Sequence, residues 1–176
     1  MEELVIRRAE MKDYETVRQF YYDVIDGFQT YEFKPMWEKD IYPSREQLKT
    51  SIGLGEYYMG LLGEKMVCGM IMNHSWNDGY DSCPWRVDAK REEVTVLHAL
   101  GVLCGYTGRG FAKALVSYAI AEAKKNGGKA MRLDVLEGNI PANRLYEAFG
   151  YEKISTLSLF YDDTGWMNFE LYELAI

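Results

Sequence analysis

Glycines and cations between an apolar run and an amphipathic run are the first residues that indicate a binding site. Gly108 and Gly110 flank Arg109, and Lys113 follows three residues later. The start of a helix leaves about four main-chain N–H groups without acceptors and is partly positive. Glycines let the chain bend there and let a ligand come close, and the two cations add charge. The segment predicts a cradle for a phosphate or pyrophosphate; an ordinary strand-to-helix turn is the alternative.

The runs on either side of this cradle predict the elements that hold it. Residues 94–103 are mostly apolar and rich in Val, which favours a strand buried on both faces. From residue 111 onward, apolar residues recur at helical spacing. This spacing predicts a long helix over 108–126 that Gly127 ends. The predicted order is therefore strand, glycine turn, helix.

His98 lies inside the predicted strand and is a candidate general base. Its ordinary pKa of ~6.5 suits proton transfer near neutrality. Alternation along the strand places its side chain on the same face as Leu100 and Val102. A histidine that is simply hydrogen-bonded in the core is the alternative. Glu92 or Glu93, at the start of the strand, is the carboxylate that would take its place as base.

The segment TGRGFA at 107–112 resembles the acetyl-coenzyme A signature of the GNAT N-acetyltransferase superfamily. That signature is Gln or Arg, any two residues, Gly, any residue, and then Gly or Ala. Gly110 and Ala112 match it, whereas Thr107 stands where Gln or Arg is usual. The departure removes one anchoring side chain but no main-chain donor.

Two further stretches resemble the same family. NIPANRLYEAFGY at 139–151 is similar to its asparagine, helix, tyrosine and Gly-Tyr ending, and LHALGV at 97–102 is similar to its fourth strand. The opening VIRRAEMKDYETV, at 5–17, resembles its first strand and helix. The resemblance covers most of the chain and is most specific over 94–151.

The resemblance implies a fold and an activity. The fold is one α/β domain of the α+β type over residues 1–176, with a central mixed sheet of six to seven strands flanked by about four helices. The activity is transfer of an acetyl group from acetyl-coenzyme A to a primary amine, by direct attack in a ternary complex. A non-catalytic module that binds and senses coenzyme A is the alternative. An ATP-binding domain fits less well, because Gly-x-x-x-x-Gly-Lys followed by Ser or Thr is absent from the sequence.

The resemblance also implies roles for individual residues. His98 would act as the base, and Tyr146 would protonate the leaving thiolate; an aromatic packing residue is the alternative for Tyr146. Asn139 and Asn143 would make polar contacts to the coenzyme, although Asn139 also suits a helix N-cap. The full set of cofactor-binding residues expected from the resemblance is Leu100, Gly101, Val102, Gly108, Arg109, Gly110, Phe111, Ala112, Lys113, Asn139 and Asn143. Gly101 inside the strand would mark a bulge or a close backbone approach.

Aromatic residues outside these motifs are candidates for the wall of an acceptor pocket. They are Tyr31, Trp37, Trp76, Trp85 and Tyr161. Residues 28–43 are aromatic without clear periodicity, so they either line a pocket or cover the core. Residues 76–91 are polar and irregular, which is typical of an insertion, and the sequence leaves open whether this segment forms a lid over the active site.

Composition limits the partners of the chain. It has 176 residues, 48% of them hydrophobic, and a formal net charge of −7, which argues against nucleic acid and is compatible with cationic amines. No run approaches the ~20 apolar residues of a membrane span. The three cysteines show no Cys-x-x-Cys spacing, so no metal site is expected. The expected setting is the cytoplasm, with a small-molecule or peptide amine as acceptor, no membrane, and a monomer or homodimer.

The remaining elements follow from local signals. Asp13 is expected to cap a helix that ends at Gly27, and Ser44 to cap a second helix over 45–52. The expected strands are 4–7, the hairpin 57–62 and 66–73, a strand at 130–136 parallel to 94–103, and a closing pair at 152–161 and 168–174 joined by 162–166, with a short helix at 141–149.

Overall fold

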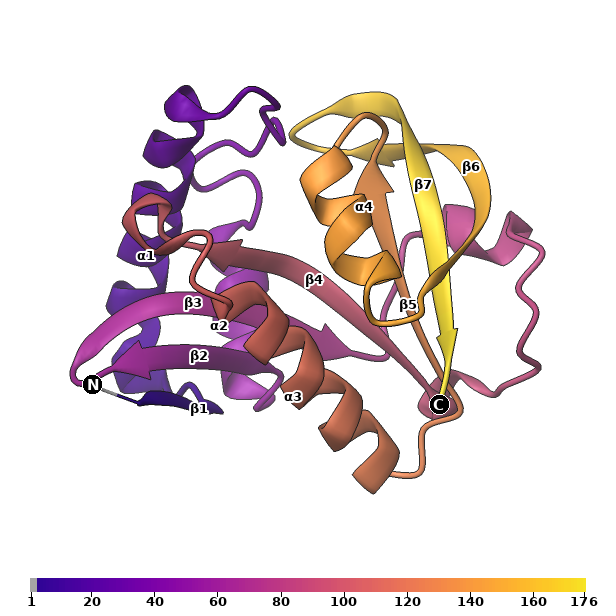
Figure 1. Ribbon diagram of the computed structural model, residues 1–176, viewed down its shortest axis with the longest axis horizontal. Helices are drawn as coiled ribbons and strands as arrows, with labels where there is room; N and C mark the ends of the chain where they lie inside the picture. The colour runs from indigo at the N-terminus through magenta and orange to yellow at the C-terminus, as the bar shows by residue number, and fades with distance from the viewer. Residues whose placement is uncertain (1–2) are drawn as a thin grey trace. The chain divides into compact units, whose positions relative to one another are not determined.

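The computed structural model describes residues 3–176, and Figure 1 shows its ribbon. Its helices and strands in chain order are β1 (Leu4–Arg8), α1 (Tyr14–Gly27), α2 (Arg45–Gly53), β2 (Tyr57–Leu62), β3 (Lys65–Asn73), β4 (Val94–Val102), α3 (Phe111–Lys125), β5 (Ala130–Leu136), α4 (Ile140–Glu147), β6 (Glu152–Tyr161) and β7 (Gly165–Ala175). Over the described residues, seven strands form one sheet in the order β1-β2-β3-β4-β5-β7-β6. The expected mixed sheet with four helices is confirmed.

Strand directions follow from the connections. β1 with β2 and β2 with β3 are antiparallel, as are β5 with β7 and β7 with β6. β4 and β5 are parallel, with Val94–Val96 paired to Ala130–Arg132, because the helix α3 crosses between them. The predicted turn between the last two strands is too long: β7 begins at Gly165, and Trp166 lies in the strand opposite Phe160. Gly165 has φ +65°, which allows the chain to reverse immediately before the strand.

Capping residues explain where the helices begin and end, with one correction. The Ser44 hydroxyl accepts a hydrogen bond from the Gln47 N–H at 3.0 Å, as predicted. The Asp13 side chain does not cap α1, because a 3₁₀ turn already makes the chain helical there. Its carboxylate instead accepts from the Glu10 N–H and pairs with Arg7. None of the helices within 3–176 combines the length and apolar character of a membrane span.

The described chain divides into two compact units, each with its own core. The first runs to Met72 and also contains His98–Leu115. The second consists of Asn73–Leu97 and Val116–Ile176. The core of the first unit packs residues of α1, α2, β2 and β3 against Ala99 of β4. In the second unit, Figure 1 shows α4 beside β5 and β7, whose Leu133 and Leu171 are buried.

The aromatic loop after α1 covers the core of the first unit. Phe28, Trp37 and Tyr42 pack against that core. The Trp37 ring contacts the rings of Phe28, Tyr42 and the buried Tyr21. The same Trp37 lines a shallow pocket of about 340 Å³ together with Phe28 and Lys34. The loop therefore covers the core, and a role in lining an acceptor pocket stays a prediction.

Candidate functional site

The glycine cradle is open and precedes the helix. α3 begins at Phe111, three residues later than predicted. Gly108 has φ +74° and Gly110 φ +86°, a left-handed conformation that a helix cannot continue through, so the helix starts only after them. A Cβ added at either glycine would meet nothing within 4 Å, and both residues are exposed, as is Lys113. The backbone conformation, rather than lack of space, requires glycine at both positions.

Cations gather on aromatic rings beside this cradle. The Arg109 guanidinium lies 5.0 Å from the Tyr106 ring and 5.1 Å from the Phe111 ring. The Lys65 ammonium, from the start of β3, lies 5.1 Å from the Tyr106 ring. Sequence reasoning missed Lys65, because it is distant in the chain and belongs to no motif. With Lys113, these groups give the cradle a positive surrounding that suits an anion.

The strand β4 contains a kink at Ala99. This residue has φ +50°, a conformation that residues with a Cβ rarely adopt. The hydroxyl of Tyr21 donates to the Ala99 carbonyl at 2.7 Å, and the hydroxyl of Tyr57 donates to that of Tyr21 at 3.1 Å. All three residues are buried, so the Tyr21 hydroxyl satisfies the Ala99 carbonyl inside the core, and the Tyr57 hydroxyl bonds that of Tyr21 in turn.

The two faces of β4 are as alternation predicts. His98, Leu100 and Val102 are half-buried, whereas Ala99 and Gly101 are buried. A Cβ at Gly101 would make ordinary contacts of 3.6 Å with side chains of α1. Neither lack of space nor a positive φ requires glycine at 101, and a bulge or a close backbone approach at Gly101 stays a prediction. The irregular backbone lies two residues earlier, at Ala99. Tertiary hydrogen bonding, which no local pattern reports, holds it there.

Two asparagines predicted to contact a coenzyme belong to the start of α4. Asn139 is the N-cap, and its Oδ1 accepts from the Ala142 N–H at 3.3 Å. Asn143 donates from Nδ2 to Glu170 at 2.6 Å. The Oδ1 atom of Asn143 is buried without a hydrogen-bond partner within the described chain. Asn139 thus has the structural role that was its alternative, and Asn143 keeps an unused acceptor.

Tyr146 lies on the same helix and is 8% exposed. Burial, with a smaller contribution from the charge of Asp134, raises the pKa of its hydroxyl. A raised pKa keeps the hydroxyl protonated and able to donate near neutrality. The ring also packs edge-on against Tyr151 at 5.5 Å, so the residue is part of the core as well.

Asp134 of β5 is a residue that sequence reasoning missed. Its Oδ2 accepts hydrogen bonds from the hydroxyls of Tyr80 at 2.6 Å and Tyr161 at 2.7 Å. Desolvation raises the pKa of this carboxyl above its ordinary value, against the effect of the two tyrosines. The available signal was one acid with apolar neighbours on both sides, Leu133 and Val135. Tyr161 was predicted as an acceptor-pocket residue, and the structure places it here.

The end of α1 and the cradle segment meet at Cys104. A Cβ added at Gly27 would lie 2.8 Å from the Cys104 Cβ, and the Cys104 Sγ lies 3.3 Å from the Thr30 hydroxyl. Tyr31 interacts with Cys104 and Thr107, and burial raises the pKa of its hydroxyl. Of the aromatic residues predicted to line the acceptor pocket, Tyr31 therefore lies beside residues 104–107, which lead into the cradle.

Comparison with known proteins identifies the family. The model of the acetyltransferase (GNAT) family matches residues 15–151. The chain belongs to the GNAT acetyltransferase family. An uncharacterised N-acetyltransferase of Methanocaldococcus jannaschii is 34% identical over 71 residues, which are 40% of this chain and 31% of that protein. The similarity thus spans about a third of the relative's length.

Solved structures share the GNAT fold. A GNAT-family acetyltransferase from Streptococcus agalactiae has a TM-score of 0.80 at 18% identity, covering 98% of this chain and 95% of that one. Arabidopsis thaliana NAA60, solved in complex with acetyl-CoA, has a TM-score of 0.71 at 16% identity and covers 99% of both chains. A putative acetyltransferase, yncA of Salmonella typhimurium, solved with its cofactor acetyl-CoA, has a TM-score of 0.67 at 15% identity, covering 98% and 94%.

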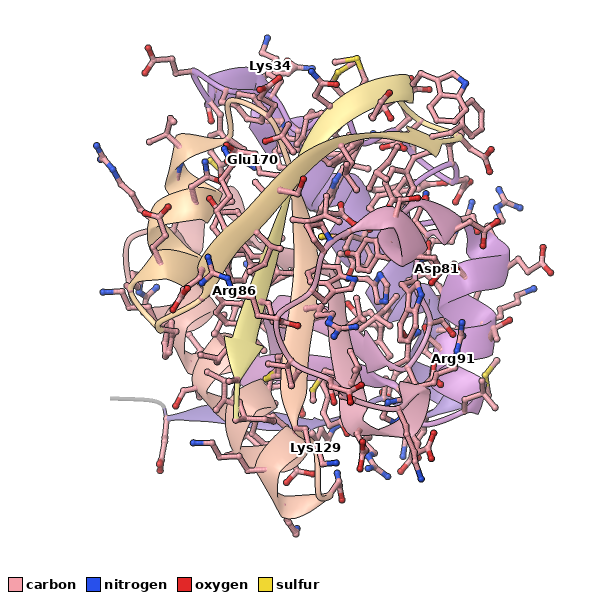
Figure 2. The ribbon with its side chains drawn as sticks, turned by 90° about the vertical axis from the view of Figure 1, so that its right-hand side faces the viewer. Lys34, Asp81, Arg86, Arg91, Lys129 and Glu170 are labelled. Carbon is pink, nitrogen blue, oxygen red and sulfur yellow. The ribbon has the colours of Figure 1, made fainter. Side chains whose placement is uncertain are left out.

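In this GNAT chain, residues 76–91 are held to the β5–β7 part of the sheet. The Glu173 carboxylate accepts from the main-chain N–H groups of Arg86 at 2.9 Å and Val87 at 3.1 Å, and it pairs with the buried Arg132 at 2.9 Å. The Arg132 guanidinium lies 4.5 Å from the Trp85 ring. Figure 2 shows Asp81 and Arg86 on this segment.

The other candidate groups of the GNAT site have structural partners. Trp76 lies under the Arg91 guanidinium at 4.3 Å and donates to Asp81. The Glu93 carboxylate pairs with Lys129 at 2.9 Å, and this bond lowers its pKa. A carboxylate stabilised in this way is a poor proton acceptor, which argues against Glu93 as the base. Among the described residues, no group of three His, Cys, Asp or Glu side chains could hold a metal ion.

Proposed function

We propose that the chain moves an acetyl group from acetyl-coenzyme A to a primary amine, by direct attack of the amine in a ternary complex. Membership of the GNAT family supports the reaction class. Two structural relatives were solved with acetyl-CoA, which supports the cofactor. The observation that carries the proposal is the exposed glycine cradle before α3, with left-handed Gly108 and Gly110 and no atoms where their Cβ atoms would be.

The residues present fit coenzyme A. Main-chain N–H groups at 108–113 would hold the pyrophosphate, with Arg109 and Lys113 adding positive charge. Main-chain groups at 100–102 would pair with the pantetheine arm, and the buried, unpartnered Oδ1 of Asn143 is an acceptor available to a ligand donor. When bound, acetyl-coenzyme A supplies the acetyl group as a reactive thioester.

The chain's own residues would then move protons and stabilise charge. A lysine-like ammonium has a pKa near ~10.4, so a base must take a proton before the nitrogen can attack. We assign this role to His98, on the half-buried face of β4. The main-chain N–H of Leu100, which follows the kink, would donate to the developing oxyanion. Tyr146, whose raised pKa keeps it protonated, would donate to the leaving thiolate.

We also propose that residues 1–176 act as one catalytic domain in the cytoplasm, as a monomer or homodimer. The three cysteines Cys68, Cys83 and Cys104 are all unpaired thiols, which is compatible with a reducing compartment. Burial raises the pKa of Cys68 to about 12, which makes that thiol unreactive.

An amine panel assayed by release of free thiol tests the proposal. We expect turnover with at least one class of primary amine. His98→Ala and Tyr146→Phe should each lower kcat by about 10²-fold or more, because a positioned acid or base contributes ~10²–10⁴. Calorimetric affinity for coenzyme A should stay unchanged in both variants. If coenzyme A binds but no amine causes thiol release, the proposed acetyltransferase activity is refuted and the non-catalytic module that senses coenzyme A is favoured.

A further inference from the structure

Asp134 differs from the other poorly accessible carboxylates of its unit because no cation matches its charge. Glu173 pairs with Arg132, and Glu170 pairs with Lys153. Within the described part of its own unit, Asp134 forms no ion pair, and the only groups that act on its pKa there are the two tyrosine hydroxyls. Withdrawing a carboxylate from water without a counter-charge is costly and raises its pKa, so a ligand that brings positive charge would favour the ionised form of Asp134.

The hydrogen bonds of Asp134 leave one oxygen available. Both tyrosine hydroxyls donate to Oδ2, from Tyr80 and Tyr161, and no other described residue of this unit donates to Oδ1. The residue is half-buried rather than sealed, whereas its neighbours Leu133 and Val135 are 1% and 4% exposed. The tyrosines therefore fix the orientation of the carboxylate and present its second oxygen to a donor.

The surroundings of Asp134 suit an organic cation. The Tyr80 ring lies 5.4 Å from the Trp85 ring, and the Tyr161 ring lies 5.1 Å from the Phe169 ring. Aromatic rings beside a carboxylate favour ammonium groups through both charge and ring quadrupoles. The two tyrosines come from distant parts of the chain, the 76–91 segment and the end of β6, and the fold brings them to one atom.

The carboxylate is also close to a residue with a proposed catalytic role. The charge of Asp134 contributes to the raised pKa of Tyr146, so the two groups lie within electrostatic range of each other. An amine held at Asp134 would therefore be near the tyrosine that we assign to the leaving thiolate.

We propose that Asp134, fixed by Tyr80 and Tyr161, binds the acceptor as a primary alkylammonium ion through Oδ1. This inference rests on the proposed function and names the substrate class of its acceptor side: cationic amines, not neutral or anionic molecules. The 76–91 segment takes part in acceptor recognition through Tyr80. Because Glu173 anchors this segment through two main-chain hydrogen bonds, the segment would act as a fixed wall of the acceptor site.

Binding of a simple amine in the absence of acetyl-coenzyme A tests the inference. The full chain is titrated near neutral pH with n-butylamine and, separately, with uncharged n-butanol, while amide NMR shifts are followed. Butylammonium should give saturable shifts in β5 and in 76–91, and butanol should not. Asp134→Asn should weaken butylammonium binding at least tenfold. Equal binding of butanol, or unchanged affinity in Asp134→Asn, would overturn the proposal.

Two further variants guard against a trivial result. Tyr161→Phe removes one donor to Oδ2 while keeping the ring, and it should weaken butylammonium binding by severalfold. Glu152→Gln removes an exposed carboxylate of the same unit, whose partner is Arg86, and it should leave binding unchanged. If Glu152→Gln weakened butylammonium binding as much as Asp134→Asn, the overall negative charge of the protein would explain the binding, and a specific site at Asp134 would be refuted.

The outcome is separable from that of the proposed function. If butylammonium binds at Asp134 but no amine is acetylated, the binding site stands and the enzyme assignment fails. If amines are acetylated and Asp134→Asn leaves their KM unchanged, the enzyme stands and the binding site fails. If both are correct, Asp134→Asn raises the amine KM at least tenfold and leaves the KM of acetyl-coenzyme A unchanged.

Discussion

Single residues in this chain differ in how far their neighbours in sequence explain them. Gly108 and Gly110 were recognisable because a glycine pair between a strand and a helix has a known physical use, and both have positive φ. Asp134 had no such pattern: one acid in an apolar strand is ambiguous until Tyr80 and Tyr161 are brought to it by the fold. Asp13 shows the opposite error. Its residue type predicted a helix cap, but a 3₁₀ turn already includes it, and its side chain does not cap α1.

Gly110→Ala should damage the cradle through its backbone. The added Cβ has room, but φ +86° is unfavourable for any residue with a side chain, by about 1–2 kcal/mol. The segment should therefore shift, and affinity for coenzyme A should fall about tenfold in calorimetry. Gly105→Ala is the matched control, because a Cβ there also meets nothing and no left-handed φ is involved. Equal losses in the two variants would mean that the cradle conformation does not matter.

At the scale of elements, periodicity predicted most of the order of strands and helices, including the parallel pairing of β4 and β5. It could not predict the kink at Ala99. Alanine has no special tendency toward positive φ, so the kink depends on Tyr21 and Tyr57, which are far away in sequence. Local reasoning pointed to Gly101 instead, where a Cβ would make only ordinary contacts with α1, so the structure shows no constraint that requires glycine there.

Tyr21→Phe should therefore destabilise the chain and disturb β4 together. Removing the hydroxyl leaves the buried Ala99 carbonyl without its donor, which costs about 1–3 kcal/mol in the free energy of unfolding. The KM of acetyl-coenzyme A should rise as well, because the kink precedes residues 100–102. Chemical denaturation and steady-state kinetics measure the two effects.

Tyr57→Phe is the control for this change. It removes the outer hydroxyl but leaves the bond from Tyr21 to Ala99 in place. It should cost less stability and leave the KM of acetyl-coenzyme A near its original value. If Tyr57→Phe raised that KM as much as Tyr21→Phe, general core damage would explain both.

For the whole molecule, the formal net charge of −7 acts on any charged ligand. Cationic acceptors should be attracted at low ionic strength, where the Debye length is ~30 Å at about 0.01 M salt, and much less at about 0.15 M, where it is ~8 Å. The KM of a cationic amine should rise about threefold to tenfold over this range, with kcat unchanged. Assays in NaCl, with sucrose at matched osmolarity as control, measure it. If the KM of the cationic amine does not change with salt concentration, only local contacts determine how the acceptor binds.

The way in which residues 76–91 are fastened has a consequence for how this chain can diverge. Glu173 holds the segment through the main-chain N–H groups of residues 86 and 87, which every residue except proline provides. Substitutions there need not alter the path of the chain. Exposed positions of the segment, such as Asp81 and Asp88, can consequently be exchanged on a constant frame, so that relatives could acquire new acceptors without redesigning the domain, whereas the buried Tyr80 is held by its bond to Asp134.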